Sequence, residues 1–165
     1  MNPKFVSFGP VKVAGYLHKT SHSNNTIPAF WQELFADGRH GKLHSADWMK
    51  DHKDYGVCFD SDGDGFSYVV GVEVKDGANV PDEFHICDLP KGEYAVFPAE
   101  SIEGIPQAWQ NAHDWLESAE SNAYTKGSVD FELYDLDCTC KDGAVCQNCK
   151  NNTVKCDVYV AVTKK

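Results

Sequence analysis

The sequence contains an internal repeat, and this repeat limits the folds that the chain can adopt. The segment Ile27-Pro28-Ala29-Phe30-Trp31 is echoed in the second half of the chain by Ile105-Pro106-Gln107-Ala108-Trp109. One short apolar run precedes each copy and two more follow it. The sequence therefore predicts one domain, residues 1–165, built from two related halves at about 11–75 and 90–163. Halves of this kind leave a cleft between them, and ligands favour such junctions.

Both copies of the repeat are predicted to be amphipathic helices. Thr26 can cap the first helix and Gly38 can end it. A further short helix is expected within residues 41–53, where Ser45 can cap 46–49. The apolar residues of the two main helices recur at the spacing that places them on one stripe; they are Ile27, Phe30, Trp31, Leu34 and Phe35 in the first helix, and Ile105, Ala108, Trp109, Ala112 and Leu116 in the second.

The apolar runs around the helices are typical of strands, because they are short, rich in aromatic and β-branched residues, and bounded by polar or glycine residues. The predicted fold class is α+β, with duplicated strand-helix-strand-strand halves forming a mostly antiparallel sheet, two main helices and a ligand cleft between the halves. An extra strand is possible at 83–87. The expected strands are 13–17, 55–60, 68–74, 94–97, 131–135 and 157–162.

The composition of the chain argues against nucleic-acid binding, a membrane span and secretion. The 165 residues carry 25 acidic and 15 basic side chains, a net charge of −10, and Arg39 is the only arginine. This charge disfavours direct nucleic-acid binding. No run approaches the roughly 20 apolar residues of a membrane span, and the start lacks the pattern of a secretion signal. The expected location is the cytoplasm, where the seven cysteines would stay reduced.

One predicted strand carries an ionisable residue among aromatic ones. In Asp130-Phe131-Glu132-Leu133-Tyr134, alternation puts Glu132 and Tyr134 on one face and Phe131 and Leu133 on the other. If the apolar pair meets the helices, Glu132 looks to the opposite side. A buried carboxylate needs a partner, such as a cationic ligand. A solvent-facing glutamate on a half-exposed sheet is the alternative.

Two further clusters contain metal-ligating residue types. A cysteine-rich segment could close a structural zinc site, could be a reduced hairpin tip, or could form redox pairs; its candidate ligands are Cys138, Cys140, Cys146 and Cys149. His40 and His44 have the spacing of a metal pair on a helix, but Gly38 and Gly41 argue against a helix there. No cofactor is otherwise indicated.

The residues resemble the GyrI-like effector-binding domain, found in multidrug-sensing transcription activators and gyrase-inhibitor proteins. The similarity runs from about Val11 to Thr163 and is most specific in 91–97, 109–116, 131–134 and 158–160. It implies an aromatic-lined ligand cleft between the halves, with Glu132 at its base. It also implies that Tyr134 lies beside that glutamate on the same face and that Tyr159 contributes to the cleft from the neighbouring final strand. Trp31 and Trp109 would form the cleft walls or pack in the core.

The leading functional hypothesis is a stand-alone protein that binds an amphipathic small molecule, cationic or aromatic. One alternative is a gyrase-inhibitor-like protein-interaction module, which would have a protein partner; a homodimer is also possible. The other alternative is a hydrolase of a reactive small molecule with Glu132 as general base. If Tyr134 of the second half is matched to Phe59 of the first, then Glu132, two residues before Tyr134, matches Val57. The carboxylate therefore occurs in only one half of the repeat.

Overall fold

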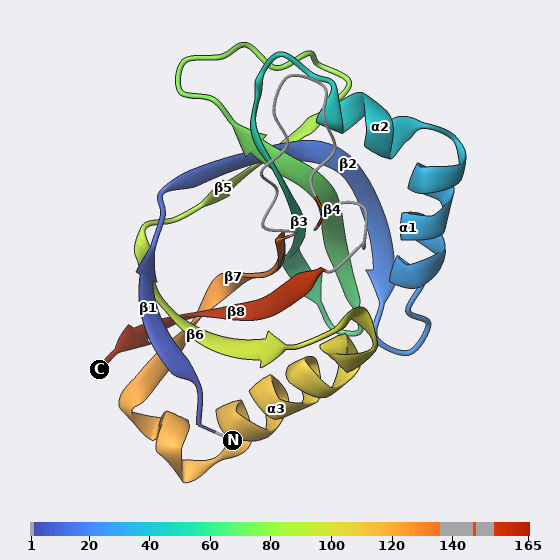
Figure 1. Cartoon of the computed structure of the whole chain (residues 1–165). Helices are drawn as coiled ribbons and strands as arrows, with labels where there is room; N and C mark the ends of the chain where they lie inside the picture. The colour runs from blue at the N-terminus through green and yellow to red at the C-terminus, as the bar shows by residue number, and fades with distance from the viewer. Residues whose placement is uncertain (1, 136–146, 148–153) are drawn as a thin grey trace.

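A single eight-stranded sheet carries three helices in the computed structural model, which describes residues 2–135, 147 and 154–165 (Figure 1). Short 3-10 turns at Ile102–Gly104 and Ala119–Ala123 flank the last helix. The strands are β1 (Lys4–Phe8), β2 (Val11–Ser21), β3 (Met49–Asp62), β4 (Gly65–Val74), β5 (His85–Leu89), β6 (Gly92–Ala99), β7 (Tyr124–Asp135) and β8 (Lys155–Lys164), and the helices are α1 (Ile27–Ala36), α2 (Arg39–His44) and α3 (Ile105–Glu117).

The strand order shows the duplication directly. It is β1-β6-β8-β7-β3-β4-β2-β5, and all neighbours are antiparallel. The halves β2-α1-β3-β4 and β6-α3-β7-β8 therefore meet at the β3–β7 pair in the middle of the sheet. This confirms the predicted α+β class and the strand-helix-strand-strand order of each half.

Each half also lends one edge strand to the other. β1 precedes β2 in the chain but pairs with β6, while β5 precedes β6 but pairs with β2. This exchange draws the two ends of the sheet toward each other, and Figure 1 shows the resulting curl. The extra strand expected near 83–87 is β5, whereas β1 was not predicted.

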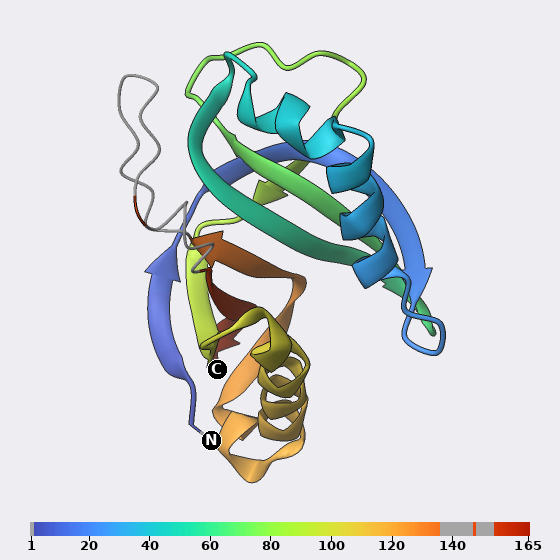
Figure 2. The same cartoon turned by 45° about the vertical axis from the view of Figure 1, so that its right-hand side comes forward.

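The helices cover the outer face of the curled sheet, one main helix over each half (Figure 2). Phe30 and Leu34 of α1 pack against Phe66, Tyr68 and Val70 of β4. The matching stripe of α3 packs on β6 and β8 through Ala108, Ala112 and Trp115. Phe35, at the end of the predicted α1 stripe, is 60% exposed.

The inner face of the sheet holds a separate core rich in aromatic residues. Phe131 and Leu133 of β7 belong to it, so they face away from the helices. The expectation that they might meet the helices is therefore wrong. It is Glu132 and Tyr134 that lie on the helix-covered face of β7. Rings close around Phe131, including those of Phe8 at 5.2 Å and Tyr94 at 5.4 Å between centroids.

Two local predictions also need correction. The short helix expected within residues 41–53 lies earlier in the chain, as α2, so Ser45 is its C-cap and not its N-cap, and β3 begins at Met49. Neither glycine prevents α2: Gly38 precedes the helix as its N-cap in a left-handed conformation (φ 82°), and Gly41 lies within it. Thr26 occupies the N-cap position of α1 without a capping bond, since its hydroxyl oxygen lies 2.7 Å from His18 Nε2 instead.

None of the helices among the described residues has the length and apolar character needed to span a membrane. The zinc candidates Cys138, Cys140, Cys146 and Cys149 lie outside the described residues, so the zinc prediction stays a prediction.

Candidate functional site

Glu132 is buried where the two halves meet, on the helix-covered face of β7, and is only 4% exposed. The Trp109 indole Nε1 donates a hydrogen bond of 3.1 Å to its Oε1. The Tyr68 hydroxyl donates to Oε2 at 3.3 Å, and the Tyr134 hydroxyl donates a short bond to the same oxygen. Three aromatic side chains from α3, β4 and β7 thus converge on one carboxylate.

A second tryptophan completes this cluster from the other helix. Trp31 of α1 donates through Nε1 to the Tyr68 hydroxyl at 3.0 Å, and its ring lies 5.0 Å from that of Tyr134. A relay of two hydrogen bonds therefore connects Trp31 to Glu132 through Tyr68. The equivalent tryptophans of the repeat, Trp31 and Trp109, approach the carboxylate from opposite halves.

A glycine makes room for this arrangement. Gly56 of β3 is the residue that pairs with Glu132 of β7 in the sheet. A Cβ atom at Gly56 would lie 2.1 Å from the Tyr68 hydroxyl, closer than any real Cβ contact. The absence of a side chain at Gly56 therefore allows Tyr68 to reach the carboxylate.

The partners of Glu132 are neutral. Burial raises the pKa of its carboxyl, and the hydrogen bonds from Tyr134, Trp109 and Tyr68 only partly oppose this. Burial also raises the pKa of the Tyr68 and Tyr134 hydroxyls well above their usual range, so both remain protonated donors. Among the described residues, no lysine, arginine or histidine hydrogen-bonds or ion-pairs with Glu132.

The neighbouring thiols do not supply a second ionised group. Burial raises the pKa of Cys58 and of Cys156, and the proximity of Glu132 raises both further. A thiol held protonated is a poor nucleophile and a poor metal ligand. The site therefore contains one ionisable carboxyl within a neutral, largely aromatic shell.

Of the five residues predicted for the site, the structure brings together Glu132, Tyr134, Trp109 and Trp31. Tyr159 is not among them. It pairs with Phe131 across the β7–β8 ladder, on the inner face, and the two rings stack at 4.6 Å. Tyr159 does lie on the neighbouring final strand, but it does not face Glu132, because neighbours in register share a face and Glu132 is in register with Val158.

The first-half counterpart of Glu132 also needs correction. Val57 pairs with Phe131 and is buried in the inner core, whereas Gly56 pairs with Glu132. Counting along the sequence therefore gave a residue on the opposite face of the sheet from Glu132, since a shift of one residue exchanges the two faces of a strand.

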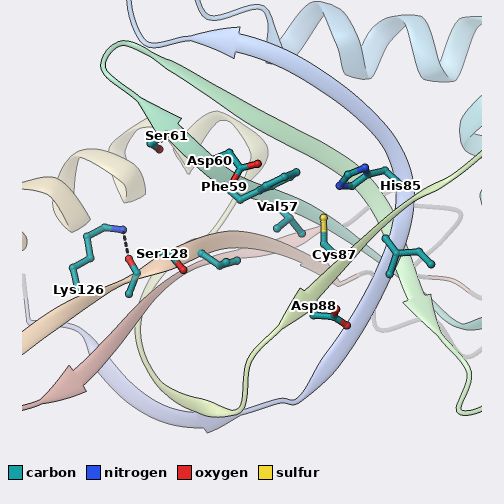
Figure 3. Close-up of a pocket in the computed structure, with 12 residues that line it drawn as sticks. Val57, Phe59, Asp60, Ser61, His85, Cys87, Asp88, Lys126 and Ser128 are labelled. Atoms are coloured by element: carbon teal, nitrogen blue, oxygen red, sulfur yellow. Dashed lines mark hydrogen bonds between the residues drawn. The ribbon is translucent and has the colours of Figure 1, made fainter.

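A cavity of about 480 Å³ lies on the inner face of the sheet (Figure 3), and no member of the Glu132 cluster lines it. It shares Val57 and Cys87 with the inner core. Its wall includes Phe59 and His85, whose rings stack at 5.5 Å. Side chains of both charge signs border it, including those of Asp88 and Lys126. The two faces of the central strands therefore offer two chemically different sites.

Comparison with known proteins places this chain in a family. Residues 5–162 match the family described as integron-associated effector binding protein, Cass2. The chain belongs to this effector-binding family. That membership agrees with the GyrI-like resemblance seen in the sequence.

This effector-binding chain is similar in sequence to a transcription regulator and in fold to two solved structures. It is 30% identical over 137 residues to the transcriptional regulator BrlR of Pseudomonas aeruginosa, which is 82% of this chain and 48% of that protein. The chain thus spans about half the length of this curated relative. The structure of SAV2435 bound to tetraphenylphosphonium is 18% identical, with a TM-score of 0.69, covering 99% of this chain and 94% of that one.

The second solved structure is the Vibrio cholerae integron cassette protein VCH_CASS2, which is 14% identical. Its TM-score is 0.63, and the match covers 98% of this chain and 96% of that one. At these identities, the two structures show a shared fold across the whole effector-binding domain.

Proposed function

We propose that this effector-binding domain binds an amphipathic organic cation between α1 and α3, with Glu132 as the counter-charge. One observation carries the proposal: Glu132 is a buried carboxylate at the junction of the two halves, and its hydrogen-bond partners among the described residues are all neutral. A carboxylate in this setting lacks the opposite charge that normally accompanies a buried ion.

A bound cation would supply that missing charge. Desolvation disfavours the ionised form of Glu132, and neutral donors offset only part of this. An organic cation placed against the carboxylate would favour ionisation by direct charge pairing. The rings of Trp31, Trp109 and Tyr134 would add cation–π and apolar contacts, which favour a ligand that is both aromatic and cationic.

Access to Glu132 requires movement of side chains. The rings of Trp31 and Tyr134 contact each other, and both are half-buried next to the carboxylate. A ligand would displace the Tyr134 hydroxyl from Oε2 and push Trp31 outward together with the surface of α1. Phe35, exposed one helical turn after Trp31, extends this apolar surface toward solvent.

Two relatives support the proposal. The neighbouring structure of SAV2435 holds tetraphenylphosphonium, a lipophilic aromatic cation. BrlR is a transcriptional regulator about twice as long as the matched region. We therefore propose that this domain senses a ligand in transcription regulation and that a partner or a further segment passes the signal on.

A pair of ions with the same shape tests the charge requirement. Tetraphenylphosphonium and tetraphenylborate differ mainly in the sign of their charge. Isothermal titration calorimetry should detect binding of the phosphonium and little or no binding of the borate. In Glu132→Gln the phosphonium affinity should fall by at least about tenfold, which corresponds to about 1.4 kcal/mol.

Two control variants sharpen the interpretation. Glu73→Gln removes a carboxylate of β4 that pairs with Lys50 at 3.0 Å, and it should leave phosphonium binding unchanged. Tyr134→Phe keeps the ring but removes a donor that competes for Glu132, so binding should persist or tighten. Equal affinities for the two ions, or undiminished phosphonium binding by Glu132→Gln, would exclude charge pairing at Glu132.

A further inference from the structure

His40, His44 and Asp54 form a compact cluster where α2 meets β3. His40 and His44 are one helical turn apart and so project from the same side of α2. His40 Nε2 lies 2.9 Å from Asp54 Oδ2, and His44 Nε2 lies 2.6 Å from Asp54 Oδ1. Helix α2, which Gly38 and Gly41 argued against in the sequence, brings the two imidazoles together.

The donor atoms have the separation that a metal ion needs. One nitrogen from each histidine and one carboxylate oxygen all lie within 4.8 Å of one another. Tetrahedral bonds of about 2.0–2.2 Å from zinc to nitrogen and oxygen place its ligand atoms roughly 3.4 Å apart. Small rotations about the side-chain bonds would therefore open the hydrogen-bonded cluster into a coordination sphere.

The cluster is sheltered and pre-organised. The side chains of His40 and His44 are each 17% exposed and that of Asp54 is 15% exposed. The two imidazole rings stack at 4.4 Å, and the ring of Phe35 lies 4.4 Å from that of His40. Such packing limits the rotamers of the donors before any ion arrives.

His52 lies outside the three-residue cluster and orients the imidazole of His44. His44 Nδ1 lies 2.9 Å from His52 Nδ1, and the two rings are nearly parallel. If His44 binds a metal through Nε2, its Nδ1 carries the proton and donates a hydrogen bond to His52 Nδ1. Metal-bound histidines commonly have such a partner, which fixes the tautomer and the ring orientation.

We propose that His40, His44 and Asp54 bind one divalent transition-metal ion, preferably zinc, and that His52 positions His44. Two imidazoles and one carboxylate suit zinc and its late first-row neighbours better than magnesium or calcium, which prefer oxygen ligands. Water would complete the sphere on the exposed side. The ion would tie α2 to the centre of the sheet at β3.

The test uses the full chain with Cys138, Cys140, Cys146 and Cys149 changed to serine, so that thiolates cannot bind the ion. After treatment with a chelator, this protein is titrated with Zn²⁺ by calorimetry and with Co²⁺ by absorption spectroscopy. We expect one ion per chain, with cobalt bands lacking thiolate charge transfer. Added Zn²⁺ should also raise the melting temperature, because it binds the folded state.

Variants identify the ligands. Asp54→Asn keeps the shape of the side chain, and His44→Gln removes an imidazole; each should weaken Zn²⁺ binding by more than about tenfold. His52→Gln should weaken it by about tenfold, the usual effect of losing an outer partner. His22→Gln, a change at an exposed histidine outside the cluster, should have no effect.

Circular dichroism and metal-free melting temperatures establish that each variant is folded. Failure of the four-serine protein to bind Zn²⁺ would overturn the proposal, as would unchanged affinity in folded Asp54→Asn. Equal binding of Mg²⁺ and Zn²⁺ would also overturn it, because an unspecific acidic surface would then explain the result.

Discussion

Glu132 combines two properties that seldom occur together at one residue. It is buried as deeply as the core residues around it, yet its partners among the described residues are neutral donors rather than a cation. Burial raises the pKa of this carboxyl because solvent no longer stabilises its charge. When this carboxyl is ionised without a partner, it destabilises the folded state. A bound cation would remove that cost by pairing with the charge.

The raised pKa predicts a specific pH dependence of stability. Folding favours the protonated form of Glu132, so its contribution is complete below the ordinary value of 4.5 and is lost as the pH rises through the folded-state pKa. Glutamine cannot ionise. The free energy of unfolding of the wild type, minus that of Glu132→Gln, should therefore decrease as the pH increases above about 4.5.

Urea unfolding at a series of pH values measures this difference. Glu73→Gln, measured in parallel, controls for the loss of one negative charge at another place on the sheet. A wild-type advantage that grows with pH would show that the surrounding donors stabilise the charged form more than burial opposes it.

At the scale of single residues, the sequence predicted the central carboxylate but not its full environment. Glu132 was identifiable because a charged residue interrupts an aromatic strand. Tyr159 was misplaced and Tyr68 was missed, because the face of each depends on strand register, which the sequence does not specify. Gly56 is a weak indication in the sequence, because a glycine within an otherwise apolar strand often marks a place where another group comes close to the backbone. Here that group is the Tyr68 hydroxyl.

At the scale of elements, helices and strands with clear periodicity were predictable. α1, α3 and six strands follow from apolar spacing, whereas α2 did not, because it is short and contains Gly41. β1 was missed because it is short and pairs with β6, far away in the sequence. Its turn into β2 requires Gly9, whose φ is 82° and whose added Cβ would lie 2.8 Å from the Pro90 carbonyl oxygen.

The β3–β7 pair predicts a strong effect for a small substitution. Gly56→Ala would place a methyl group against the Tyr68 hydroxyl, which must then leave Glu132 or displace β3. We expect a loss of about 1–3 kcal/mol in the free energy of unfolding, as for other overpacked cores. Gly92→Ala, at a glycine with open space around it, is the matched control and should change stability by less than about 0.5 kcal/mol.

Chemical denaturation of both variants measures the effect. A loss of stability at Gly56 no larger than that at Gly92 would mean that Tyr68 is not held in the position described here.

At the scale of the whole molecule, the duplication creates two faces with different chemistry. The outer face carries Glu132, which the helix α3 contacts through Trp109 and α1 approaches through Trp31 and Tyr68. The inner face carries the cavity beside His85 and Lys126 (Figure 3). The repeat predicted a junction between halves. The curl that separates the two faces was not predictable, because it arises from the exchange of β1 and β5 between halves.

The distinction between these faces leads to the most direct test, a crystal structure of the chain grown with tetraphenylphosphonium. We predict phosphonium density between α1 and α3, with the cation beside the Glu132 carboxylate and with Trp31 and Tyr134 moved from the positions described here. Density for the cation in the inner cavity, near Asp88 and Lys126, with the Glu132 cluster intact, would contradict the proposed site.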